Sequence, residues 1–171
     1  LLGMGYRFLA DDMAVVEISR GEGVWVYPAY PYMKLCRDAV ARQGHVSEGL
    51  RYIDEKKDKF LVPCAEQFQR EKVRLERFVW LKIQSEEEKA GERSGTITVD
   101  RIAGPDSILV YKNNLFTRHL WKNQDPGMEI WQNCLRMARE IPVFGVKRPA
   151  AGDSTAEVAA EVHKLRSAVS A

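Results

Sequence analysis

Hydrophobic residues occur in short runs over most of this chain and at helical spacing in its last third. Runs rich in strand-forming residues and bounded by glycine, proline or charge predict strands at residues 6–10, 24–27, 59–63 and 78–83. A further apolar run at 13–18 is joined to 24–27 by Gly21-Glu22-Gly23, which predicts a hairpin. Weaker patterns predict strands at 96–99 and 142–146.

Apolar residues spaced three and four apart predict helices at 33–43, 108–120, 126–140 and 155–169. Asp125-Pro126 is a helix start, and Ser154-Thr155-Ala156-Glu157 is a capping box. The polar span 45–58 is expected to be a loop. This order of elements predicts one α/β domain, residues 1–171, around a mixed sheet with flanking helices. Leu1-Leu2 before Gly3 is typical of a final helical turn, so we expect an N-terminally truncated chain.

Composition narrows the class of protein. The 171 residues are 45% hydrophobic and 29% charged, as in a globular domain with its own core. The net charge of +2 is spread along the chain, which argues against a nucleic-acid partner. The sequence has neither an apolar run of about 20 residues nor a secretion leader, so we expect no membrane partner and a cytoplasmic location. Cys36, Cys64 and Cys134 lack metal-binding spacing and are expected to be free thiols.

The sequence GYRFLADD ends an apolar run with two adjacent carboxylates, Asp11 and Asp12. Two carboxylates at the end of a buried strand are both readily ionised only if a cation shares the site. Mg²⁺ takes oxygen ligands and is usually shared with substrate phosphates, so one carboxylate would hold the metal while its neighbour takes a proton from an attacking hydroxyl. The alternative is a junction at which Asp11 or Asp12 merely caps a loop.

GYRFLADDMAVVEI followed by VWVYPAYPYMKL resembles the HPr kinase/phosphorylase family, and more narrowly the shorter HPr serine kinase-like proteins. In that family a P-loop opens a helix that ends in glycine, and a short strand then ends in Asp-Asp. The resemblance implies a P-loop kinase-like fold, similar to PEP carboxykinase, with ATP and Mg²⁺ as cofactors. It also implies that Asp12 is the catalytic base and that Asp11 faces the metal. No GxxxxGK[ST] motif occurs in these residues, and we expect the P-loop part to precede them.

The stretch PAYPYMKLCRD supplies candidate substrate-binding residues: Tyr30, Tyr32, Lys34 and Arg37. The tyrosines would form a wall for an acceptor peptide, and Lys34 or Arg37 would face phosphate. A rigid turn that packs its aromatic rings on the core explains the stretch about as well. Lys59, after a charged loop, would bind the nucleotide phosphate, although such a lysine is more often simply solvated. The three histidines, His45, His119 and His163, are expected to be structural.

The leading hypothesis is therefore an ATP-dependent serine kinase. Its partner would be a nucleotide and a small protein or peptide with an acceptor serine, either HPr-like or the precursor of a ribosomally made, modified peptide such as a lasso peptide. The family also tends to assemble, so the resemblance implies a homo-oligomer. Two alternatives remain: a non-catalytic module that binds a peptide or partner, and a carboxykinase acting on a small acid. The sequence offers no clear arginine set for a dicarboxylate, which ranks the carboxykinase last.

Overall fold

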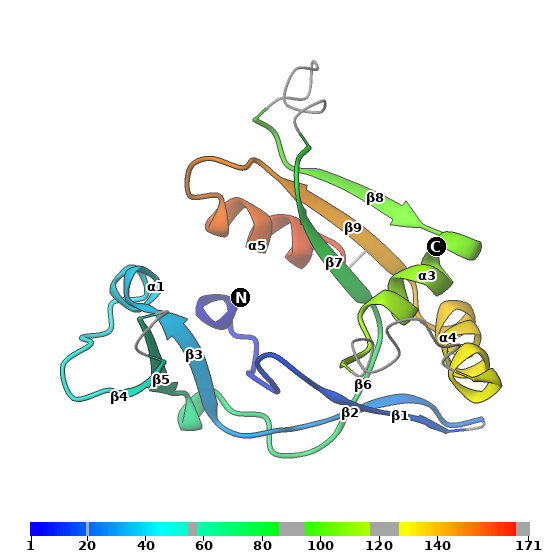
Figure 1. Ribbon diagram of the computed structural model, residues 1–171, viewed down its shortest axis with the longest axis horizontal. Helices are drawn as coiled ribbons and strands as arrows, with labels where there is room; N and C mark the ends of the chain where they lie inside the picture. Colours follow the sequence, from blue (N-terminus) through cyan, green and yellow to red (C-terminus); the bar gives the residue numbers. More distant parts are fainter. Residues whose placement is uncertain (20, 55–57, 86–94, 117–126, 167–171) are drawn as a thin grey trace. The chain divides into compact units, whose positions relative to one another are not determined.

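A computed structural model describes the chain except for residues 20, 55–57, 86–94, 117–126 and 167–171 (Figure 1). The described residues form small sheets and four α-helices, which confirms the general α/β class. The chain divides into two compact units. The first comprises residues 1–17 and 25–74, and the second comprises residues 18–24 and 75–171. Each unit is described by itself.

A three-stranded antiparallel sheet organises the first unit. Its order is β3-β5-β4, with β3 at Tyr32–Cys36, β5 at Lys59–Pro63 and β4 at Arg51–Asp54. One face carries Met33, Phe60 and Val62, which pack with Val40 of the short helix α1 (Arg37–Arg42). Because β5 alternates between buried and half-buried residues, its opposite face is available for polar side chains.

Two predictions in this region are wrong. The helix predicted at 33–43 begins only at Arg37, and 32–36 form β3 instead. Leu35 and Val40 fit a helical stripe, yet pairing of Met33 with Val62 and of Leu35 with Phe60 favours the strand. The expected loop 45–58 contains β4, whose pairing shifts between Tyr52 and Asp54 at a bulge-like irregularity.

The start of the chain differs from the expected strand. A single 3-10 turn, η1 (Leu2–Met4), includes Gly3 and ends at Gly5, which is in the left-handed conformation, so the predicted helical turn ends two residues later than expected. Residues 6–10 are not a buried strand, because among them only Phe8 forms an isolated bridge, to Phe68. Backbone hydrogen bonds from Phe8 to Gln67 and from Gln69 to Phe8 hold this extended segment just after η2 (Ala65–Gln67).

The expected hairpin is present in a second small sheet, of order β1-β2-β6. Its strands are β1 (Val15–Ser19), β2 (Gly23–Tyr27) and β6 (Val73–Arg74), and β2 pairs antiparallel with β6. The boundary between the two units falls within β1 and β2.

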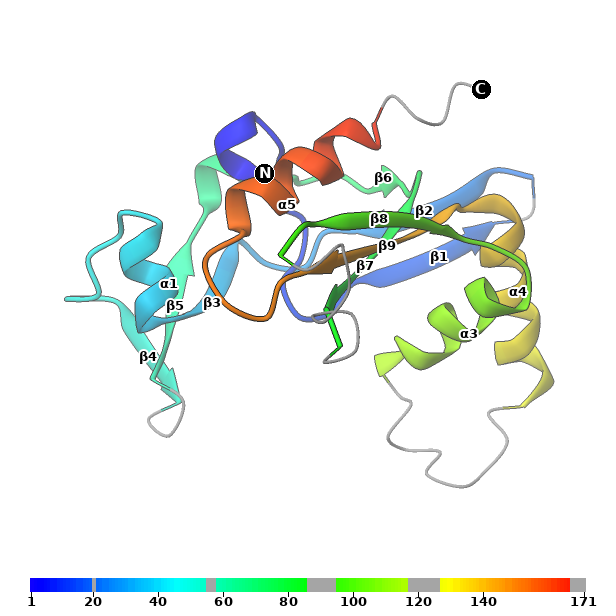
Figure 2. The ribbon, with the colours of Figure 1, turned by 90° about the horizontal axis from the view of Figure 1, so that it is seen from above.

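The second unit contains a mixed sheet, a type of sheet that the sequence predicted, and its strand order is β7-β9-β8. The predicted strands are found as β7 (Phe78–Ile83), β8 (Thr98–Ile102) and β9 (Val143–Arg148), with β9 parallel to β7 and antiparallel to β8. Helices α3 and α4 lie on one side of this sheet and α5 on the other (Figure 2). The central strand is therefore buried on both faces from Val143 to Val146.

The helices of this unit begin close to where the pattern placed them. They are α3 (Pro105–Asn113), α4 (Met128–Glu140) and α5 (Thr155–Lys164). Asp125-Pro126, the predicted start of α4, lies outside the described residues. Ser154 is the N-cap residue of α5, but its side chain makes no capping hydrogen bond, so the capping box does not form; Asp153 instead accepts hydrogen bonds from the Thr155 amide and hydroxyl. Within the described ranges, no helix has the length and apolar character needed to cross a membrane.

Candidate functional site

Asp11 and Asp12 both bind the same residue of the first unit, Lys34 in β3. The backbone N–H of Lys34 donates to Asp11 Oδ2 at 3.0 Å, and its ammonium group lies 2.7 Å from Asp12 Oδ2. Because β3 is an edge strand of its sheet, its outer N–H groups need partners other than β5. Asp11 thus accepts a hydrogen bond from an outward-facing N–H of the edge strand β3, while Asp12 binds the side chain of the same residue, Lys34.

The electrostatics of this cluster favour an ionised Asp12. Its hydrogen bond with the Lys34 ammonium lowers the pKa of the Asp12 carboxyl, an effect that partial burial opposes and the charge of Lys59 supports. Asp12 in turn raises the pKa of Lys34, with a smaller contribution in the same direction from Tyr30. The side chain of Asp12 remains 57% exposed, so an ionised carboxylate with a fixed partner faces solvent.

Strand register places further predicted residues beside this pair. Lys34 lies opposite Leu61, so Lys59, two residues before Leu61 along β5, shares the face of Lys34. Tyr32 precedes Lys34 by two positions and lies on that face as well. Tyr30 and Tyr32 are 42% and 39% exposed, so neither ring is buried in the core. Tyr32, Lys34 and Lys59 therefore share one face of the sheet, and Tyr30 lies near Lys34.

Arg37, the fifth candidate, lies on the opposite side of the sheet. Its guanidinium group stacks over the ring of Phe60, 4.9 Å from the ring centroid, and Phe60 belongs to the buried face. The guanidinium also binds Asp58 through Nε at 2.7 Å and Nη2 at 3.0 Å. The structure therefore brings Arg37 to the turn before β5 and does not bring it to Asp12.

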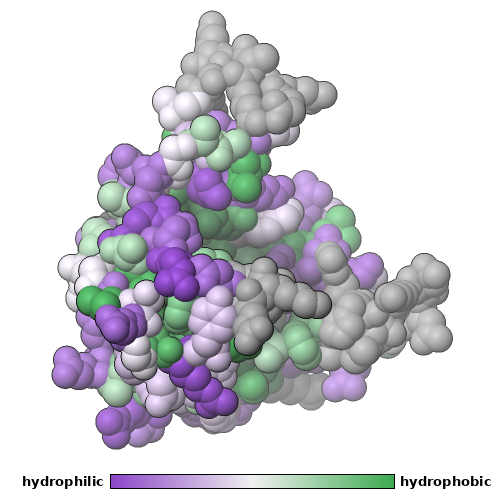
Figure 3. Space-filling view, turned by 60° about the vertical axis from the view of Figure 1, so that its left-hand side comes forward, coloured by the Kyte–Doolittle hydropathy of each residue, from purple (hydrophilic) through white to green (hydrophobic). Residues whose placement is uncertain are grey.

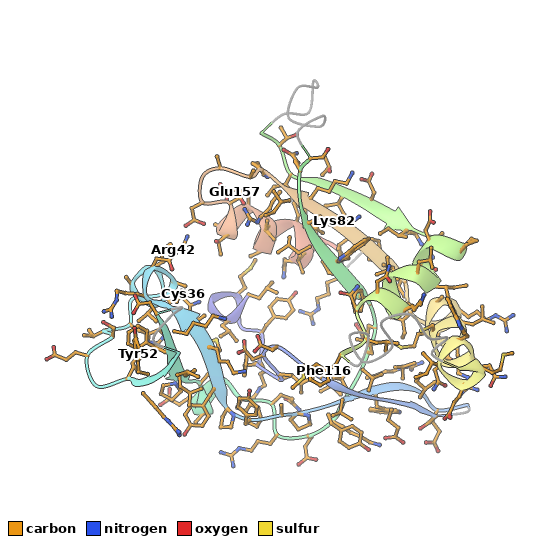
Figure 4. The ribbon with its side chains drawn as sticks, viewed as in Figure 1. Cys36, Arg42, Tyr52, Lys82, Phe116 and Glu157 are labelled. Atoms are coloured by element: carbon orange, nitrogen blue, oxygen red, sulfur yellow. The ribbon has the colours of Figure 1, made fainter. Side chains whose placement is uncertain are left out.

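Asp58 has a backbone φ of 48°, a conformation that residues other than glycine rarely adopt. The Asp58 carboxylate, which binds Arg37, also accepts a hydrogen bond from the Tyr52 hydroxyl at 2.6 Å. The hydrogen bond with Arg37, followed by that with Tyr52, lowers the pKa of Asp58. This network holds Asp58, the residue directly before Lys59 (Cys36 and Tyr52 are labelled in Figure 4).

The carboxylate pair fits a hard divalent cation in its donor chemistry. Mg²⁺ is commonly held by one or two carboxylates together with water and substrate phosphates, rather than by a complete protein cage. Asp11 and Asp12 each use Oδ2 for Lys34, and neither Oδ1 atom has a hydrogen bond among the described residues. The part of the chain that the structure describes contains no group of three or more His, Cys, Asp or Glu side chains placed to hold a metal.

Arg51, which was not among the residues predicted from the sequence, lies on the face of Lys34 and Lys59. Leu61 pairs with Lys34 on one side and with Arg51 on the other, so Lys34, Leu61 and Arg51 form a row across β3, β5 and β4. The short run Arg51-Tyr52-Ile53 was the available signal, since it contains two strand-forming residues within an otherwise polar span.

Cysteines and histidines add little to the site. All three cysteines are free, as predicted; Cys64 and Cys134 are buried, whereas Cys36 is half-buried. Burial, followed by the nearby charge of Asp11, raises the pKa of the Cys64 thiol. His45 and His163 are exposed, and His119 lies outside the described residues.

The second unit has a hollow of about 440 Å³ between its sheet and α3. Gly145 forms part of its lining, with Trp80 and Asp100 paired to Gly145 from either side. The ammonium group of Lys82 lies 3.4 Å from the centroid of the Trp80 ring and covers that aromatic surface (Lys82 is labelled in Figure 4). None of the residues predicted to act on phosphate or substrate lines this hollow.

Comparison with known proteins adds no assignment: no family model, curated protein or solved structure matches the chain.

Proposed function

We propose that this chain belongs to an ATP-dependent serine kinase of the HPr kinase-like group, with a P-loop kinase fold and a small protein or peptide as acceptor. The observation that carries the proposal is the Asp12 carboxylate, ionised and solvent-facing, held 2.7 Å from the Lys34 ammonium next to a second carboxylate. Phosphoryl transfer depends mostly on positioning and charge neutralisation, and this cluster supplies groups for both tasks. ATP as phosphate donor implies a cytoplasmic protein.

In this mechanism Asp12 accepts the proton of the acceptor serine hydroxyl. The serine oxygen forms a bond to the γ-phosphorus of ATP, and the bond between that phosphorus and the bridging oxygen breaks, so that ADP leaves with the electron pair. Lys34 keeps Asp12 oriented through their ion pair, and Lys59 attracts the phosphate charge. Asp11 would hold Mg²⁺, which would neutralise charge on the phosphate oxygens.

The test is Asp12→Asn in the whole protein, assayed with Mg·ATP and a serine-containing peptide. Positioned acid–base groups contribute about 10²- to 10⁴-fold to a rate, so transfer should fall by at least about 100-fold. The affinity for Mg·ATP, measured by calorimetry, should stay within a few-fold of the wild type. An Asp12→Asn protein that phosphorylates the peptide at the wild-type rate would refute the role of Asp12.

A second candidate is the non-catalytic binding module. Tyr30 and Tyr32, exposed beside Lys34, offer a surface for a peptide that requires no phosphate donor. The two candidates differ in nucleotide binding: the kinase requires a measurable heat of Mg·ATP binding to the whole protein, whereas the binding module requires none.

A further inference from the structure

The hollow of the second unit lies between the β7-β9-β8 sheet and α3 and has a volume of about 440 Å³. Small-molecule sites commonly enclose about 300–1,000 Å³, so this volume suits a small ligand. Three residues that pair across the strands form a row along its floor: Trp80, Gly145 and Asp100. Leu109 and Val110 line it from one face of α3. The hollow therefore offers a ligand both aromatic and aliphatic surface.

Gly145 keeps the floor of the hollow open. It is buried in the central strand β9, where glycine weakens a strand and often marks a place at which a ligand approaches the backbone closely. A Cβ atom at this position would lie 3.2 Å from Cδ1 of Ile102, which also lines the hollow. Any larger side chain at residue 145 would therefore enter the hollow, and glycine leaves that space to a ligand.

The hollow carries charges of both signs. The charged side chains in its described lining are two lysines and two aspartates: Lys82, Lys147, Asp100 and Asp106. The lysines come from the neighbouring strands β7 and β9 and pair with each other in register. The aspartates come from β8 and from α3, the helix that directly follows β8. The charges of the lining thus cancel in sum, while the two signs come from different elements.

Lys82 is held in place while its hydrogen-bond donors remain available. Its ammonium group lies 3.4 Å from the centroid of the Trp80 ring, and this cation–π contact occupies no hydrogen-bond acceptor. Among the described residues, the side chains of Lys82, Asp100 and Asp106 make no hydrogen bond or ion pair. Both aspartates are exposed to solvent. A positive group with a fixed position and two negative groups are therefore available to a ligand.

Exposed apolar side chains alone do not indicate a binding site, because they are ordinary on protein surfaces. Figure 3 shows hydrophobic residues scattered among hydrophilic ones over the face in view. The hollow differs from such a surface because an aromatic ring, a buried glycine and charges of both signs meet in one concave place. This combination of apolar lining and a few polar groups is typical of small-molecule sites.

We propose that the hollow binds a small zwitterion, namely an amino acid with an apolar side chain. Lys82 binds its carboxylate and Asp100 binds its ammonium group, both through charge-assisted hydrogen bonds. Ile102 and Leu109 contact its side chain. A purely anionic ligand would lie near the aspartates and a purely cationic one near the lysines, and like charges disfavour binding. This site is independent of the proposed kinase, because none of its residues has a role in that mechanism.

The experiment compares L-phenylalanine with two analogues that each lack one charged group. Phenylpropionate lacks the ammonium group, and phenethylamine lacks the carboxylate. Each compound is titrated into the isotope-labelled whole protein, and binding is followed by NMR at the Gly145 amide and the Trp80 indole N–H. L-Phenylalanine should bind with a Kd on the order of 0.1–1 mM, and each analogue should bind at least about tenfold more weakly.

Variants assign each charge of the ligand to a residue. Lys82→Met should weaken L-phenylalanine binding by about three- to tenfold and should not weaken phenethylamine binding, because phenethylamine has no carboxylate. Asp100→Asn should weaken L-phenylalanine binding to a similar extent and should not weaken phenylpropionate binding. Circular dichroism of each variant checks that its fold is retained.

Lys112→Met is the matched control for Lys82→Met. Lys112 also lies over a tryptophan ring of the second unit, 4.8 Å from the centroid of Trp131, but it does not line the hollow. This variant should leave all three affinities unchanged. Equal losses of L-phenylalanine affinity in Lys82→Met and Lys112→Met would place binding outside the hollow and overturn the proposal.

Two results with the wild type would also overturn the proposal. One is the absence of any change at Gly145 and Trp80 with L-phenylalanine up to about 10 mM. The other is an analogue that binds as tightly as L-phenylalanine, because the hollow would then accept an anion or a cation alone. The assay contains no nucleotide and no acceptor peptide, so its failure leaves the proposed kinase standing.

Discussion

Asp11 is predicted to have a structural role that can be separated from any role at a metal. Its carboxylate accepts the backbone N–H of Lys34 at 3.0 Å on the edge of β3, and the side chain is half-buried. Asp11→Ala removes this acceptor, whereas Asp11→Asn keeps a carbonyl oxygen of the same shape. The two variants therefore differ in the hydrogen bond while both lose the negative charge.

The magnitude follows from the kind of bond. Hydrogen bonds to charged groups contribute roughly 1.5–3 kcal/mol, and partial exposure reduces the loss in Asp11→Ala to about 1–2 kcal/mol. Asp11→Asn should lose less than about 0.5 kcal/mol. For a urea m-value of about 2 kcal/mol/M, the midpoint of unfolding should fall by roughly 0.5–1 M in Asp11→Ala only.

Amide hydrogen exchange gives the local measurement. The Lys34 amide should exchange about 5- to 30-fold faster in Asp11→Ala than in the wild type, while Asp11→Asn stays close to the wild type. The amide of Val62, in the neighbouring strand, serves as an internal reference. Equal exchange of the Lys34 amide in both variants would show that the Asp11 side chain does not hold the β3 edge.

Three further changes test the surroundings of the site. Lys34→Met should raise the pKa of Asp12 toward its ordinary value of 3.8, as followed by NMR titration of the carboxyl carbon. Because the ion pair lowers the pKa of Asp12, it stabilises the fold above about pH 4, and this stabilisation is lost as the pH falls through the lowered pKa. Lys34→Met should abolish this loss of stability at acidic pH. A variant whose stability depends on pH as the wild type does would contradict the pairing. Asp58→Ala should lower the melting temperature more than Asp58→Asn, since Ala tolerates a φ of 48° poorly and offers no acceptor; equal melting temperatures would count against the network. Val62→Ala, at a fully buried position, should cost about 1–3 kcal/mol in urea unfolding, whereas Val46→Ala, at a position 72% exposed, should change stability by less than about 0.5 kcal/mol.

The fold of the second unit is largely predictable because its hydrophobic pattern is compatible with only one kind of secondary structure in each segment. Residues 78–83 are a run of strand formers bounded by charge, and 142–146 are a continuous apolar run, so the pattern places both strands to within two residues. The helix starts of this unit are predicted as well, although the side chain that accepts the hydrogen bonds at the start of α5 is not. Asp153 and Ser154 are both good caps, and the choice between them depends on local backbone geometry.

The first unit is harder to predict because its short strands gain their stability from pairing. Tyr32–Cys36 contains residues that suit a helical stripe as well as an alternating strand, and only the partner β5 decides between them. Arg51–Asp54 has little apolar character of its own, so its pattern predicts a loop where β4 forms. Tertiary pairing therefore overrides local propensity at both positions.

The candidate site is predictable in its residue types and not in its pairings. Asp11 and Asp12 are adjacent in sequence, so their proximity is certain, but their shared partner Lys34 lies 22 residues from Asp12. Arg37 follows Lys34 by three residues, and the sequence predicted that one or the other would face phosphate. The passage from strand to helix turns Arg37 to the other face, toward Asp58. Sequence separation indicates the face of a sheet only once the extent of the strand is known, and the sequence predicted a helix over these residues.

The most direct test of the proposed kinase is the identity of the product that the whole protein forms from Mg·ATP and a serine-containing peptide. Fragmentation mass spectrometry locates any added phosphate on the peptide, and phosphate release measured in parallel reports ATP hydrolysis. The account predicts phosphoserine on the peptide, formed faster than ATP is hydrolysed to free phosphate. A protein that binds Mg·ATP and the peptide together, yet leaves the serine unmodified, would contradict it.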